Sequence, residues 1–270
     1  MFKRLCIAAL VLCVGYVVLS ACLWYGMDLE QRCEIGDSGA CGELVLRLAQ
    51  RCKKGDSEAC KELIPHLQEA CDMNEANGCF NLGASYIEGL GVQQDYKKSI
   101  EYYQKACELN SASGCYNLGV LYQQGKGVRV NYKKSVEYYQ KACELNHASG
   151  CYNLGILYLN GQGVQKDNKK IAQYFQKACD LNHADACSNL GVLYLKKQGV
   201  QQDYKKAIQC FQKACDLDSA IGCSNLGISY ETGKGVRQNE ATAKEYFGKA
   251  CDLGEQEGCD KYRELRERGF

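Results

Sequence analysis

The feature that most constrains this chain is a pair of cysteines that recurs with one internal spacing. In the stretch from Cys107 to Cys115 the two cysteines lie eight positions apart, with an amphipathic helical pattern on either side. The second cysteine of successive pairs falls at 79, 115, 151, 187, 223 and 259, which is a strict period of 36 residues. Upstream, at 41, 60 and 79, the period is 19. Self-similarity at a fixed period predicts an elongated array of repeats.

Sixteen of the 20 cysteines belong to such pairs. The pairs are Cys33 with Cys41, Cys52 with Cys60, Cys71 with Cys79, Cys107 with Cys115, Cys143 with Cys151, Cys179 with Cys187, Cys215 with Cys223, and Cys251 with Cys259. An even, regularly spaced set predicts disulfides, and therefore an oxidising compartment. The alternative is structural zinc in a reducing cytosol. Zinc sites usually use a Cys-x2-4-Cys spacing, which the paired cysteines do not have, so no metal is expected.

Composition limits the fold class and the partners. The chain has one proline, Pro65, and is rich in Ala, Leu, Lys, Gln, Glu and Tyr, which favours helices over a sandwich or barrel. The formal net charge of +1 gives no indication of a nucleic-acid partner. We therefore expect an all-α protein without a cofactor.

Residues 1–27 have the pattern of an export signal. Two basic residues near the start precede an uncharged apolar run from Leu5 to Met27. The sequence ending at Cys22 resembles a bacterial lipobox, in which the cysteine is acylated, whereas ordinary cleavage near Ala21 would release a soluble protein. The run, at 23 residues, is also long enough to stay as an anchor. We predict an exported protein, secreted or periplasmic, with membrane attachment only through Cys22 or residues 5–27.

Three segments follow the signal. They are short cross-linked helical units at 28–73, five full repeats at 74–259, and a charged C-terminal cap at 260–270. The short units are expected as helices at about Ala40–Arg51 and Glu58–Ala70. Pro65 should kink the second helix or end it early.

The second repeat illustrates a helix–turn–helix unit, with a helix A followed by a helix B. Gly125 should end helix A with a left-handed cap, and Asn131 should cap helix B. The apolar side chains that share a face are Leu118, Leu121 and Tyr122 in helix A, and Tyr132, Val136, Tyr139 and Cys143 in helix B. A disulfide would then join helix B of one repeat to helix A of the next.

This pattern resembles the Sel1-like repeat, a relative of the tetratricopeptide repeat. The matching residues are Asn117-Leu118-Gly119, Tyr122, Gly125, Gly127-Val128, Asn131, Tyr139 and Lys141-Ala142. With its cysteine pairs and export signal, the chain is similar to the Helicobacter cysteine-rich protein family. That resemblance implies an exported, right-handed α/α superhelical solenoid. It also implies penicillin binding, weak β-lactamase activity and interaction with host or cell-envelope molecules.

The sequence offers little support for catalysis. A serine β-lactamase needs Ser-x-x-Lys, and no serine is followed by lysine at that spacing. His147 and His183 occupy equivalent positions 36 apart, where they are expected as surface turn residues. Cys210 replaces the tyrosine of other repeats, and could be a nucleophile, an intermolecular partner or a buried substitute for the ring. Lys197 replaces a turn glycine. The catalytic residues of any enzyme activity are unassigned.

A row of asparagines gives the candidate ligand site. One recurs two positions after the second cysteine of each repeat, at Asn81, Asn117, Asn153, Asn189 and Asn225. Helix A lines the concave face in related helical repeats, so these amides could bind the main chain of an extended peptide. Alternatively, each asparagine makes the same local bond to a neighbouring helix.

We therefore predict an exported scaffold that binds a peptide or protein, or a peptidoglycan fragment. The alternatives are a penicillin-binding protein with weak β-lactamase activity, which would take β-lactams, and a structural envelope lipoprotein attached through Cys22.

Overall fold

The computed structural model describes residues 28, 31, 33 and 38–270. The predictions for residues 1–27, including the export signal and Cys22, lie outside the described residues. In the described part every regular element is an α-helix. The helices are α4 (Ser38–Lys53), α5 (Ser57–Asp72), α6 (Ala76–Glu88), α7 (Tyr96–Glu108), α8 (Ala112–Gln124), α9 (Tyr132–Glu144), α10 (Ala148–Asn160), α11 (Asn168–Asp180), α12 (Ala184–Lys196), α13 (Tyr204–Asp216), α14 (Ala220–Thr232), α15 (Glu240–Asp252) and α16 (Gln256–Glu267).

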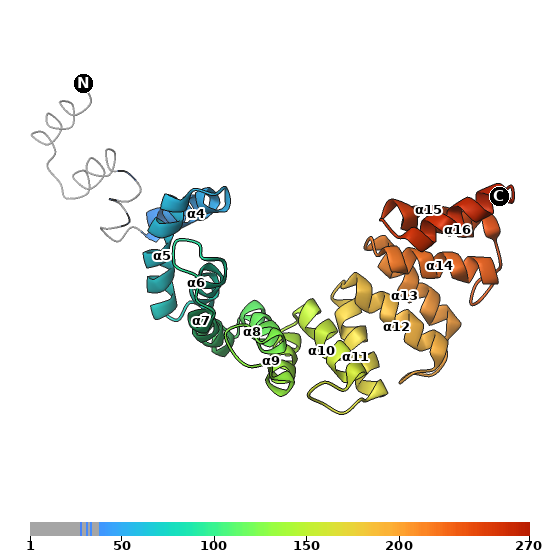
Figure 1. The fold of residues 1–270 in the computed structure, drawn as a ribbon, viewed down its shortest axis with the longest axis horizontal. Helices are drawn as coiled ribbons and strands as arrows, with labels where there is room; N and C mark the ends of the chain where they lie inside the picture. The colour runs from blue at the N-terminus through green and yellow to red at the C-terminus, as the bar shows by residue number, and fades with distance from the viewer. Residues whose placement is uncertain (1–27, 29–30, 32, 34–37) are drawn as a thin grey trace, which may run out of the picture.

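These helices form an open arc, with α4 and α16 near its two ends (Figure 1). Each helix packs against the next along the chain. Alternate helices also meet, since α12 contacts α14 and α14 contacts α16. Helices on the inside of an arc are closer together than those outside, so the even-numbered row, from α6 to α16, is the inner one. This arrangement confirms the predicted all-α solenoid with a helix A and helix B in each repeat.

Local sequence sets the helix ends of a repeat. The Ser111 hydroxyl accepts the Gly114 N–H at the start of α8, and Gly125 ends that helix with φ of 70°. Asn131 then caps α9 by accepting the Lys134 N–H at 3.1 Å. The left-handed glycine and the asparagine cap are both confirmed. At the equivalent of Gly125 in the fourth repeat, Lys197 takes φ of 56°, a conformation that costs a residue with a Cβ about 1–2 kcal/mol.

The core of each repeat is one aromatic ring packed on one glycine. Helix A supplies the glycine and helix B the ring, as in Gly119 against Tyr139 and Gly155 against Phe175. A Cβ at Gly119 would lie 2.5 Å from the Tyr139 ring, so the helices could not approach this closely with any other residue. The five rings are among the largest fully buried side chains: Tyr103, Tyr139, Phe175, Phe211 and Phe247.

Of the two effects predicted for Pro65, an early end of the helix is wrong. Helix α5 continues through Pro65 to Asp72. Leu63 and Leu67, on either side of the proline, are buried against the α4 residue Leu48 and its neighbours. This packing, with a disulfide near each end of α5, offsets the one backbone hydrogen bond that proline cannot donate.

Disulfides join helix B of each repeat to helix A of the next, and they also join α4, α5 and α6 in series. The described residues contain eight, and the Cα atoms of each pair are 4.5–4.7 Å apart. The bonds are Cys33 to Cys41, Cys52 to Cys60, Cys71 to Cys79, Cys107 to Cys115, Cys143 to Cys151, Cys179 to Cys187, Cys215 to Cys223, and Cys251 to Cys259. All sixteen predicted cysteines are therefore confirmed in their predicted pairs.

One helical position holds the second cysteine of every pair. It is the fourth residue of its helix, and the cysteines concerned are Cys41, Cys60, Cys79, Cys115, Cys151, Cys187, Cys223 and Cys259. The first turn of each of these helices is thereby fixed to the preceding segment of the chain. This many disulfides indicates an oxidising, exported environment. Across residues 38–270 no helix is both long and apolar enough to cross a membrane.

Candidate functional site on the inner face

The asparagine row lies on the inner helices, one residue on each of α6, α8, α10, α12 and α14. Asn81 is exposed, whereas the other four are half-buried. The position continues into α16 as Lys261, whose ammonium pairs with Glu231 of α14 at 3.2 Å. That ion pair directly links two neighbouring helices of the inner row, which places this position where those helices meet.

A buried tyrosine connects two inner helices in the middle of the array. The Tyr139 hydroxyl of α9 donates to the Gln123 side chain of α8 at 2.7 Å. Burial raises the pKa of Tyr139 to about 12, and a hydrogen bond from Asn153 of α10 acts in the opposite direction. The Tyr139 hydroxyl therefore lies between a glutamine and an asparagine of adjacent inner helices.

The asparagines do not all make the same bond. Asn117 bonds the Tyr103 hydroxyl, as Asn153 bonds Tyr139. Phenylalanine replaces this tyrosine in the later repeats, and Asn189 instead bonds Tyr152. Within the described chain, the amides of Asn81 and Asn225 make no side-chain hydrogen bond. Three of the five asparagines thus have a local partner, and two keep their donors and acceptors available.

The histidines differ from the expectation that they are surface turn residues. His147 and His183 are half-buried, and each is the N-cap of an inner helix. The His147 Nδ1 accepts the Gly150 N–H at 3.2 Å, while its ring stacks on Tyr116 with centroids 4.5 Å apart. His183 repeats this arrangement on Tyr152. Serine fills the same capping position as Ser111 and Ser219.

These caps predict a dependence of stability on pH. Burial lowers the pKa of both imidazoles below the usual 6.5, and the charge of His183 lowers that of His147 further. As the pH falls below 6.5, the histidines of the unfolded chain take up protons before those of the folded chain do. The stability that is fully present above pH 6.5 should therefore decrease, until the pH passes below the lowered pKa values of the folded chain. Thermal melts from pH 7.5 to 4.5 measure this. A variant with His147→Ser and His183→Ser should lose less stability over this range, and an unchanged profile would contradict the assignment.

The remaining candidates for chemistry give no catalytic site. Burial raises the pKa of the Cys210 thiol to about 11, so the thiol stays protonated at neutral pH and is a poor nucleophile. Cys210 is the one cysteine of the described residues outside a disulfide. No group of three His, Cys, Asp or Glu residues that could hold a metal occurs in the described ranges. Nothing in these residues supports the β-lactamase alternative.

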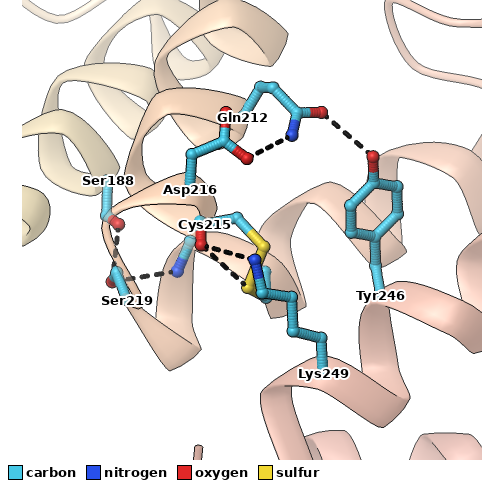
Figure 2. Close-up of a disulfide and its surroundings, with 9 residues drawn as sticks. Ser188, Gln212, Cys215, Asp216, Ser219, Tyr246 and Lys249 are labelled. Carbon is cyan, nitrogen blue, oxygen red and sulfur yellow. Dashed lines mark hydrogen bonds between the residues drawn. A yellow bond between two sulfur atoms is a disulfide. The ribbon is translucent and has the colours of Figure 1, made fainter.

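Sequence reasoning missed a second aromatic row, formed where helix A of a repeat ends beside helix B. Two tyrosines stack there in most repeats, and a lysine lies over the first ring, as Lys134 lies 4.9 Å from the centroid of Tyr122. In the last of these pairs the second tyrosine, Tyr246, reaches the preceding helix B, where its hydroxyl donates to Gln212 at 3.0 Å (Figure 2). The tyrosine period of 36 was the available signal.

The fold and the inner face define a disulfide-rich helical-repeat scaffold of the protein-binding class. A family model described as the Sel1 repeat matches residues 76–111, 112–147, 148–183, 184–219 and 220–255. The chain belongs to the Sel1 repeat family. Sel1 repeats generally mediate interactions between proteins, which gives protein partners as the coarse function.

Solved structures agree with this assignment. Helicobacter pylori cysteine-rich protein B is 41% identical, over 48% of this chain and 96% of its own, with a TM-score of 0.39. This sequence identity confirms the predicted relation to the Helicobacter cysteine-rich proteins. A protective antigen with an SLR fold from uropathogenic Escherichia coli is 25% identical, with a TM-score of 0.73 over 83% of this chain and 52% of that one.

A Sel1 repeat protein from Oxalobacter formigenes is 26% identical, with a TM-score of 0.68 over 79% of this chain and 86% of that one. The chain spans about half the length of the Escherichia coli antigen. No curated protein sequence matches the chain.

Proposed function

We propose that the inner face of the even-numbered helices binds an extended segment of a partner protein. The observation that carries this proposal is the row of asparagine amides one repeat apart, of which Asn81 and Asn225 have no partner within the described chain. A side-chain amide can donate to and accept from a peptide backbone at the same time. Successive amides on a curved row of helices would therefore bind a main chain without regard to its side chains.

Apolar side chains accompany the amides. One lies three positions after each asparagine, and therefore on the same face of the helix. These residues are Ala84, Val120, Ile156, Val192 and Ile228. On α14 the face is the most accessible, because Ile221 is 55% exposed and Ile228 is 37% exposed, with Asn225 between them. This combination supports α14 as a principal contact, with Asn225 for the main chain and the two isoleucines for apolar side chains of the partner.

Binding measurements test this proposal. Peptides selected from a random library on the wild-type protein would be titrated by fluorescence anisotropy. Asn225→Ala is expected to weaken peptide binding about fivefold to tenfold, because it removes one amide that hydrogen-bonds the peptide. This corresponds to about 1–1.4 kcal/mol of binding free energy. The melting temperature should not change, because Asn225 makes no internal side-chain bond.

Two further variants separate binding from stability. Asn153→Ala should lower the melting temperature, because it removes a partner of the buried Tyr139 hydroxyl. Gln209→Ala, at an exposed position of α13, is the matched control and should change neither quantity. If selected peptides bind Asn225→Ala as tightly as wild type, the inner face at α14 is not the peptide site. The disulfides support action in an oxidising compartment, while export through residues 1–27 and attachment through Cys22 stay predictions.

A further inference from the structure

The row of stacked tyrosine pairs lacks one ring. In four repeats two tyrosine rings stack with centroids 5.5–5.6 Å apart. The pairs are Tyr86 with Tyr102, Tyr122 with Tyr138, Tyr158 with Tyr174, and Tyr230 with Tyr246. In the remaining repeat the first ring is present as Tyr194, but Cys210 stands where the second would be. A cysteine is much smaller than a tyrosine, so Cys210 does not fill the space that a phenol ring would occupy.

A cleft of about 470 Å³ lies beside Tyr194. It is bounded by α11, by the end of α12 and by the loop that follows α12. Among the side chains that line it are Gln176, Asp180, Leu190 and Tyr194. Asp180 is also close enough to Cys210 for its charge to act on the thiol. The cleft is separate from the asparagine row, because Tyr194 and Asn189 point about 140° apart around α12.

The next repeat shows the contacts that this tyrosine makes where it is present. There the Tyr246 ring stacks on Tyr230. The Tyr246 hydroxyl donates to Gln212, which in turn donates to Asp216 at 2.9 Å (Figure 2). Thirty-six positions earlier, Gln176 donates to Asp180 with the same length of 2.9 Å. The ring platform, Tyr194, and the hydroxyl acceptor, Gln176, are therefore both present, although the tyrosine side chain that they would bind is missing.

The charged residues around the cleft indicate what kind of segment would carry an aromatic ring into it. Lys169 and Lys177 line the cleft together with a single carboxylate, Asp180. In addition, the Lys206 ammonium lies 5.6 Å from the centroid of Tyr194, on the ring that would form the platform. The surroundings are net positive, so they favour a ring with acidic or neutral neighbours over a ring with basic ones.

We propose that the cleft beside Tyr194 binds a tyrosine side chain from an acidic segment of a partner protein. The incoming ring stacks on Tyr194, and its hydroxyl donates to the side-chain oxygen of Gln176. Lysines around the cleft contact the acidic neighbours. The site adds a specific anchor to the scaffold, on a face other than the inner one, and its test does not depend on peptide binding by the asparagines.

The test is a titration with the peptide acetyl-Glu-Tyr-Glu-amide, followed through the side-chain amide resonances of the full-length protein by NMR. The Gln176 amide is expected to shift and saturate. Acetyl-Glu-Leu-Glu-amide and acetyl-Lys-Tyr-Lys-amide should bind at least fivefold more weakly. A wild-type protein that shows no saturable shift at Gln176 overturns the proposal.

Two reciprocal variants locate the site. Cys210→Tyr supplies the missing ring internally and should abolish the Gln176 shift while raising the melting temperature. Tyr246→Cys empties the filled position of the next repeat and should create a second site, seen as a saturable shift of the Gln212 amide. Undiminished binding to Cys210→Tyr would show that the peptide binds elsewhere.

Gln176→Ala is the third variant, and it retains the stacking platform. It should reduce the preference for acetyl-Glu-Tyr-Glu-amide over acetyl-Glu-Phe-Glu-amide to about one. A preference that survives this change overturns the assignment of Gln176 as the hydroxyl acceptor, whatever the behaviour of the Cys210 variant.

Discussion

Replacing Phe175 with alanine is expected to lower the free energy of unfolding by about 3–5 kcal/mol. The ring is 1% exposed and belongs to the largest buried cluster, which extends from α9 to α13. It also packs directly on Gly155, where no side chain exists that could fill the space left behind. Urea denaturation followed by circular dichroism, with the disulfides intact, measures the loss.

Tyr204→Ala is the matched control for Phe175→Ala. Tyr204 is an aromatic residue on the following helix B, but it is 42% exposed, so its removal should cost far less. In a linear array each repeat contacts only its neighbours, so the loss at Phe175 should also separate the unfolding of the two halves. A single sharp transition with a loss near that of Tyr204→Ala would show that the ring is not the centre of the repeat core.

Removing one disulfide from the middle of the array is the second large effect. The double variant Cys143→Ala with Cys151→Ala should lose about 2–3 kcal/mol, because the bridge closes a short loop and limits the unfolded chain. Both sulfurs are buried, so the alanines also leave a small cavity. Denaturation of the variant and of wild type under the same oxidising conditions gives the difference.

Position along the array provides the comparison for that variant. Removing the bond between Cys33 and Cys41, at the N-terminal end, frees the unfolded chain by the same amount, because this bridge closes an equally short loop, but it affects only one neighbouring joint. The loss of stability in this variant should be confined to the unfolding of the N-terminal end. The central variant should instead destabilise the repeats on both sides of the missing bridge. Equal and complete loss of structure in both variants would mean that the array folds as a single cooperative unit.

Much of the fold follows from short-range chemistry that a sequence displays directly. The cysteine spacing predicts the joints between repeats, Gly125 predicts a left-handed helix end, and Asn131 predicts a cap, because each acts within a few positions along the chain. Pro65 shows the limit of such reasoning. Its local effect is outweighed by packing between α4 and α5, and that packing is visible only when the helices are in place.

The candidate site was less predictable for a related reason. The five asparagines are alike in sequence, but their partners are not. Asn153 meets a hydroxyl because residue 139 is tyrosine, whereas Asn189 faces a repeat in which the equivalent residue is Phe175. The histidine caps likewise stack on rings 31 positions upstream, at Tyr116 and Tyr152. Contacts between helices, and not the residue at one position, decide these roles.

The local span of every disulfide has a consequence for how such a chain can change its length. A tandem duplication or deletion of 36 residues adds or removes one whole bridge, wherever in the repeat the breakpoints fall. A breakpoint between Cys143 and Cys151, for example, regenerates an intact pair at the new junction. The protein can therefore gain or lose a unit of inner surface in one genetic step without leaving half of a bridge unpaired.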